Sequence, residues 1–140
     1  MILLDTNVIS ESLKPLANPV ATTWLDRQPK ESLYLCATVL MEVLFGVALL
    51  PDGKRKAALG LATQHLLVNY FADRFLAFDR EAAMVYASLA SRAAARGTII
   101  SVADGQIAAI AAVHGLLSLI HISPTGRSSL SGNSAKEAER

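Results

Sequence analysis

The chain has 140 residues, a length that suits one compact domain. Hydrophobic residues make up 52% of it, yet no stretch reaches the roughly 18 uninterrupted apolar residues that a membrane span needs. The net charge is +1, and positions 1–122 carry as many basic as acidic side chains. This balance excludes a generic polyanion binder, because such binding scales with the number of phosphates neutralised. Any nucleic-acid role therefore requires a local site.

The N-terminus and the single cysteine both bear on the cellular compartment. Asp5 introduces a charge early, no basic segment precedes the apolar residues, and no small-residue cleavage site follows them. Cys36 excludes an intrachain disulfide, fits a reducing compartment and is expected to be an inert core thiol. We therefore expect a cytoplasmic protein with no membrane association.

Apolar runs and helix-capping residues predict an alternation of strands and helices. Strands are predicted at residues 2–4, 32–37, 74–78 and 116–122. Helices are predicted at residues 7–14, 20–28, 38–50, 54–71, 81–96 and 101–114, with Thr38 and Ser101 as caps. This order favours the α/β class, with a parallel sheet covered on both faces. Residues 1–122 would form the domain, and the Ser- and Gly-rich residues 123–140 are predicted to be disordered.

Three acidic residues stand alone in apolar segments. Asp5 is the only charged residue from 1 to 10, Glu42 the only one from 38 to 50, and Asp104 the only one from 97 to 122, histidines aside. All three are therefore expected in buried segments. On the helix that carries Glu42, we expect the apolar stripe at Leu40, Leu44 and Val47. An ionised carboxylate in such surroundings must be paired, protonated or bound to metal.

The predicted topology brings these acids together. Asp5 ends the first strand, Glu42 follows the second, and Asp104 lies in the first turn of a helix. Sites in open parallel sheets form beyond the carboxyl ends of the strands. Two carboxylates about 4 Å apart repel by roughly 4 kcal/mol at an effective dielectric constant of about 20, so three together require a cation. Oxygen ligands favour Mg²⁺, with Mn²⁺ as a second choice.

Each acid also has an ordinary structural interpretation. Asp5 is suited to cap the first helix, and Ser101 with Asp104 matches a capping box whose acid favours the helix dipole. Glu42 is compatible with a solvated helix face. The hypothesis of a metal site therefore depends on the three residues as a set.

Three segments carry a family resemblance. They are Ile-Leu-Leu-Asp-Thr-Asn-Val-Ile-Ser-Glu at 2–11, Thr-Val-Leu-Met-Glu-Val-Leu-Phe-Gly at 38–46 and Ala-Asp-Gly-Gln-Ile-Ala-Ala at 103–109. In this order they resemble the PIN-domain ribonucleases, and most closely the VapC and FitB type toxins of bacterial type II toxin–antitoxin pairs. The resemblance implies a three-layer PIN-like fold, with a short central parallel sheet flanked by helices. It also implies a Mg²⁺-dependent endoribonuclease acting on RNA, as a homodimer held inactive by an antitoxin.

The resemblance assigns roles to individual residues. Asp5, Glu42 and Asp104 match three of the family's acidic metal-site positions, which are also its catalytic positions. Its neighbouring polar positions, which orient carboxylates or bound water, correspond here to Thr6, Asn7 and Ser101. Helix capping explains Thr6, Asn7 and Ser101 equally well.

The sequence departs from the family pattern from about Leu116. The family usually completes its site with a further Asp or Asn, but residues 116–123 contain no acid. Loss of the natural reading frame near Leu116 is one hypothesis for this. We expect weakened metal binding, and the alternative function is an inactive PIN-fold module that still dimerises and binds an antitoxin. A receiver or phosphatase domain is less consistent, since Thr-Asn follows the first strand and residues 97–122 hold no Lys.

Overall fold

The computed structural model describes residues 1–119, and the side chains of residues 1–116. Its strands are β1 (Ile2–Leu4), β2 (Leu33–Cys36), β3 (Phe75–Leu76) and β4 (Leu117–Leu119). Its helices are α1 (Thr6–Ser12), α2 (Pro19–Arg27), α3 (Ala37–Ala48), α4 (Lys54–Tyr70), α5 (Arg80–Ala95) and α6 (Val102–Val113), with a 3-10 turn at Lys30–Ser32. The predicted domain end at residue 122 and the predicted disorder of 123–140 lie outside the described residues.

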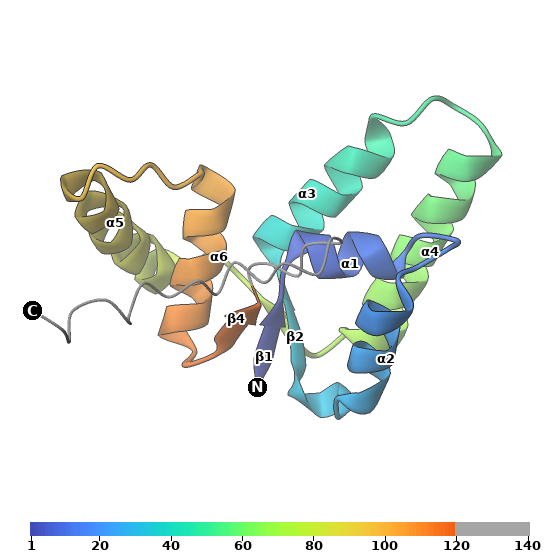
Figure 1. The fold of residues 1–140 in the computed structure, drawn as a ribbon, viewed down its shortest axis with the longest axis horizontal. Coiled ribbons are helices and arrows are strands. Elements are labelled where there is room, and N and C mark those ends of the chain that lie inside the picture. Colours follow the sequence, from blue (N-terminus) through green and yellow to red (C-terminus); the bar gives the residue numbers. More distant parts are fainter. Residues whose placement is uncertain (120–140) are drawn as a thin grey trace, which may run out of the picture.

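The four strands form one parallel sheet in the order β3-β2-β1-β4. Ile2 of β1 pairs with Leu33 on one side and with Leu117 on the other. The helices α1 to α4 lie on one side of the sheet, and α5 and α6 lie on the other (Figure 1). The predicted parallel sheet between helices is therefore confirmed. No helix within residues 1–119 is long and apolar enough to cross a membrane.

The core lies where the central strands meet α3 and α6. Leu3, Leu4, Leu35 and Ile110 are among its largest fully buried side chains. Cys36 belongs to the same core, and burial raises the pKa of its thiol, which disfavours the reactive thiolate. The expectation of an inert core cysteine is consistent with this environment.

The orientation of α3 differs from the expected one. Its buried face consists of Thr38, Val39 and Val43, whereas Leu44, expected in the core, is 47% exposed. Because α3 follows β2 without a loop, the strand fixes which face turns inward. Cys36 occupies the cap position predicted for Thr38, so Thr38 lies inside the helix.

Glycine at position 105 allows α5 and α6 to pack closely. A Cβ atom there would lie 2.5 Å from Cε2 of Tyr86 on α5, and Gly105 itself is buried. The Tyr86 ring is held in an edge-to-face contact with Phe78, with ring centroids 6.2 Å apart. The aromatic pair therefore restricts the room for any larger residue.

We predict that Gly105→Ala destabilises the fold by about 1–3 kcal/mol, because the added methyl group overpacks the α5–α6 contact. Gly60→Ala is the matched control, since that helical position has nothing within 4 Å of an added Cβ. The control is expected to gain about 0.5–1 kcal/mol from improved helix propensity. Urea unfolding measures both changes, and equal stability of the two variants would contradict the packing argument.

Candidate functional site

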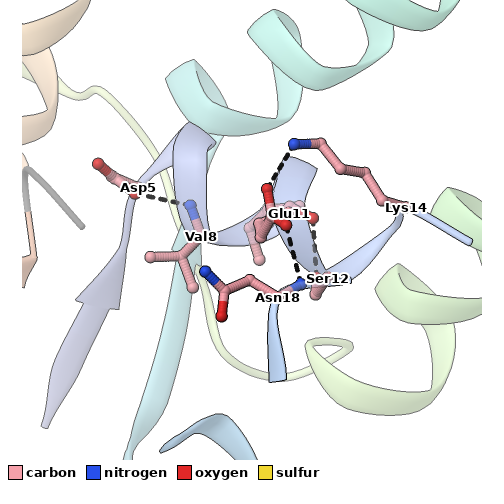
Figure 2. Close-up of polar contacts among 7 residues, drawn as sticks. Asp5, Val8, Glu11, Ser12, Lys14 and Asn18 are labelled. Carbon is pink, nitrogen blue, oxygen red and sulfur yellow. Dashed lines mark hydrogen bonds and ion pairs between the residues drawn. The ribbon is translucent and has the colours of Figure 1, made fainter. Parts of the chain in front are cut away.

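Asp5 occupies the turn between β1 and α1. It is the N-cap of α1, and its Oδ1 accepts a hydrogen bond of 3.0 Å from the Val8 backbone N–H (Figure 2). The residue is only 4% exposed. Burial of this carboxylate is therefore confirmed, and so is its capping role. The two interpretations are compatible, because a carboxylate has about four lone-pair positions.

Glu42 is held by the first residue of α1. The Thr6 hydroxyl donates a hydrogen bond to Oε2 of Glu42, which is partly buried on α3. Asp5 precedes Thr6 directly, so the chain leaving β1 supplies both a carboxylate and the donor that orients the second carboxylate. This contact supports the orienting role that the resemblance implied for Thr6.

Asp104 lies in the first turn of α6 and is exposed, so the expectation that it is buried is wrong. The inward face of α6 carries Gly105, Ile107 and Ala109 instead. The Ser101 hydroxyl accepts a 3.1 Å hydrogen bond from the Asp104 backbone N–H and donates one of 2.7 Å to Oδ2 of Asp104. Ser101 thus caps the helix, as predicted, and also orients the carboxylate.

The sheet topology directs three helix N-termini to one edge. The helices α1 and α3 begin where β1 and β2 end, and α6 runs back beside the sheet before entering β4 (Figure 1). A hydrogen bond of 3.0 Å from the Thr38 hydroxyl to Oε1 of Gln106 ties α3 to α6. The helices that carry Glu42 and Asp104 are therefore in direct contact near their beginnings.

Whether these residues fit a metal ion depends on the chemistry of their oxygen atoms and on the hydrogen bonds that those atoms already make. Three carboxylates and a threonine hydroxyl are oxygen donors suited to a hard divalent cation. In the conformation described for residues 1–119, no three His, Cys, Asp or Glu side chains form a cluster that would hold a metal. Glu42 and Asp104 instead bond to neighbouring hydroxyl groups. The donor chemistry fits, whereas closure around an ion requires these side chains to turn.

Asn7 lies at a different place on the surface from the Thr6–Glu42 contact. It is exposed and lines a hollow of about 100 Å³ together with Glu11, Lys14 and Asn18. Asp5, Glu42 and Asp104 do not line that hollow. A role for Asn7 in the site stays a prediction.

Sequence reasoning missed the link between Thr38 and Gln106. Thr38 was expected only as a helix cap, and Gln106 had no predicted role. A signal was nevertheless present, because Gln106 is the only uncharged polar side chain in α6.

The opposite end of α1 is fixed by Glu11. Its carboxylate accepts a hydrogen bond of 2.9 Å from the Asn18 backbone N–H and forms an ion pair with Lys14 (Figure 2). The Lys14 ammonium, followed by the Asn18 N–H, holds the pKa of Glu11 below its ordinary value. This contact joins the end of α1 to the start of α2.

Comparison with known proteins decides the family. The model of the PIN domain family matches residues 2–121.

The chain belongs to the PIN-domain family.

Curated relatives of this PIN domain are similar over most of their length. The Toxin FitB of Neisseria gonorrhoeae is 46% identical over 116 residues, which cover 83% of this chain and 84% of that protein. A VapC ribonuclease of Sinorhizobium fredii is 41% identical over 117 residues, 84% of each chain. The predicted resemblance to VapC and FitB proteins is confirmed.

Solved structures support the same fold. The crystal structure of FitAcB from Neisseria gonorrhoeae matches with a TM-score of 0.78 at 45% identity, covering 84% of this chain and 85% of that one. The structure of FitAB bound to a DNA fragment matches with a TM-score of 0.78 at 44% identity, covering 84% and 82%. The predicted PIN-like α/β fold is therefore confirmed.

We predict that Glu11→Gln lowers the Tm of this PIN domain at pH 7, because glutamine keeps an acceptor for Asn18 but loses the charge that Lys14 stabilises. Since folding lowers the pKa of Glu11, the stabilisation is fully present above the ordinary value of 4.5 and is lost as the pH falls through the folded value. Circular dichroism melts at pH 7 and at about pH 3 measure the difference. If the Tm difference between Glu11→Gln and wild type were as large at low pH as at pH 7, the charge of Glu11 would not be its cause. Glu31→Gln is the control at an exposed position.

Proposed function

We propose that this PIN domain is a Mg²⁺-dependent endoribonuclease, the toxin of a bacterial type II toxin–antitoxin pair acting in the cytoplasm. The observation that carries the proposal is the hydrogen bond from Thr6 to Glu42, which holds Glu42 next to the chain segment where Asp5 follows β1. Relatives named as a toxin and as a ribonuclease, each more than 40% identical, support it. The RNA substrate and the antitoxin are part of the same proposal.

In this proposal Asp5, Glu42 and Asp104 hold the cation through carboxylate oxygens. The Thr6 hydroxyl keeps Glu42 turned toward the end of β1. The Ser101 hydroxyl likewise orients the carboxylate of Asp104 by a hydrogen bond. A bound Mg²⁺, or Mn²⁺ in its place, lowers the pKa of water and offsets the charge of the transition state. As water attacks the phosphorus atom, one carboxylate oxygen or a second water molecule accepts its proton, the P–O bond to the leaving ribose oxygen breaks, and that oxygen takes up a proton from solvent.

The missing fourth acid favours a second candidate function, an inactive module that binds protein partners. One face of α3, extended by its C-cap residue Leu49, carries exposed apolar side chains: Met41, Phe45 and Leu49 are between 56% and 69% exposed. A contiguous apolar surface of this kind is typical of an interface with another protein. The same surface serves an active toxin, so dimerisation and antitoxin binding are expected under both candidate functions.

We predict that Asp5→Asn reduces Mg²⁺-dependent RNA cleavage by at least about 100-fold, because removing the charge of a proposed ligand costs no less than changing a residue that only orients a ligand, for which about 10–100-fold is typical. Asparagine is also a good N-cap, so the fold is retained. Asp79→Asn is the matched control, since Asp79 caps α5 with the same type of bond, 2.9 Å from the Ala82 N–H to Oδ1. Gel assays of RNA cleavage with and without Mg²⁺ give the measurement, and equal cleavage by the two variants would refute the assigned site.

A second prediction concerns the α3 face. Phe45→Glu places a charge on a residue that is 63% exposed, so the monomer still folds, whereas a homodimer through this face dissociates at least about tenfold more readily. Leu16→Glu is the control, since Leu16 is 93% exposed and lies outside α3. Light scattering over a concentration series measures the monomer–dimer equilibrium. Dimerisation of Phe45→Glu at the wild-type level would exclude this face.

A further inference from the structure

Few polar side chains are buried in the described part of the chain, and two of them are threonines. Thr63 is 2% exposed, and its hydroxyl donates to the Leu59 carbonyl of its own helix, 2.8 Å away. Thr38 is 3% exposed, and its hydroxyl instead crosses to α6, where it donates to Oε1 of Gln106 at 3.0 Å. The two threonines are thus equally buried but differ in what they join.

The Thr38–Gln106 bond joins the two helices that carry the candidate metal ligands Glu42 and Asp104. Thr38 precedes Glu42 by one helical turn on α3, and Gln106 follows Asp104 by two residues on α6. On its other side α3 is held by the Thr6 bond to Glu42. The helix that presents Glu42 is therefore fixed to both helices that present the other two carboxylates.

A glutamine at this place requires an explanation. Apart from Asp104 and Gln106, α6 consists of Val, Ala, Gly and Ile, which suit a buried helix. A partly buried amide without a partner costs free energy, so an apolar residue would pack here more simply. A directional hydrogen bond, unlike an apolar contact, fixes the relative position of two helices.

We propose that Thr38 and Gln106 are positioning residues, whose hydrogen bond sets the spacing between α3 and α6 and thereby between the carboxylates of Glu42 and Asp104. The inference rests on the proposed function, because it concerns the ability of these carboxylates to hold one cation. In this proposal neither residue touches the cation or the RNA. Both act only by fixing the relative position of α3 and α6.

The test measures Mn²⁺ binding to the purified full chain by calorimetry. Thr38→Val keeps the shape of the side chain and removes the hydroxyl, and Gln106→Met removes the acceptor. Each variant is expected to bind Mn²⁺ about tenfold more weakly than wild type, as observed for residues that orient metal ligands. The double variant is expected to bind no more weakly than either single variant, because both changes remove the same interaction.

Two matched variants separate positioning from simple stability. Thr63→Val removes an equally buried hydroxyl within α4 and is expected to lower the Tm without changing Mn²⁺ affinity. Thr38→Ser keeps the hydroxyl and is expected to retain Mn²⁺ affinity although it loses a buried methyl group. Thermal melts of every variant establish that binding is measured on folded protein.

The possible outcomes are distinct. Wild-type affinity in Thr38→Val, or an equal loss of affinity in Thr63→Val, overturns the positioning role while leaving the proposed function intact. A folded wild-type chain that binds no Mn²⁺ overturns the metal site and this inference together. Binding that is lost in Asp5→Asn, weakened in Thr38→Val and retained in Thr38→Ser supports both.

Discussion

The parallel pairing of β1 with β2 determines where the segments that carry Asp5 and Glu42 leave the sheet. Ile2 is opposite Leu33, so both strands end at the same edge of the sheet, and each passes into a helix without an intervening loop. Asp5 is the single residue between β1 and α1. Glu42 follows on α3, within reach of the Thr6 hydroxyl. Residues separated by more than thirty positions in the sequence are thus brought together by backbone pairing, and the side chains only refine the arrangement.

Helix N-termini and neighbouring hydroxyl groups favour negative charge at this edge of the sheet. The first turns of α1 and α6 each present backbone N–H groups that have no partner within the helix, together with the positive end of a helix dipole. Asp5 accepts from the Val8 N–H, while Asp104 and Glu42 accept from hydroxyl groups. Each of these bonds engages part of a carboxylate. A carboxylate that caps a helix keeps further lone pairs, so the capping interpretation of Asp5 and the proposed metal site do not exclude each other.

The sequence predicted the sheet, the helices and the burial of Asp5, because strand composition and capping residues are local signals. It failed at the orientation of α3. This helix is apolar on nearly all sides, so periodicity does not distinguish the face that packs on the sheet from the face that carries Phe45. The exposure of Asp104 was missed for a related reason, since α6 is almost entirely apolar and gave no indication of which side faces solvent. The isolated polar side chain of Gln106 was a local signal, but its partner Thr38 lies 68 positions away and is identified only by the tertiary contact.

The opposite faces of α3 separate the two candidate functions. Thr38 and Val43 face inward, and Glu42 bonds to Thr6 at the edge of the sheet, whereas Met41 and Phe45 face outward. Loss of a carboxylate at this edge leaves the outer face unchanged, because the described contact that holds Glu42 near β1 comes from Thr6 and not from an outward side chain of α3. Partner binding can therefore survive the loss of catalysis in this fold. The reverse also holds, because a charge placed on the outer face removes apolar contact area without altering the hydrogen bonds that orient the carboxylates.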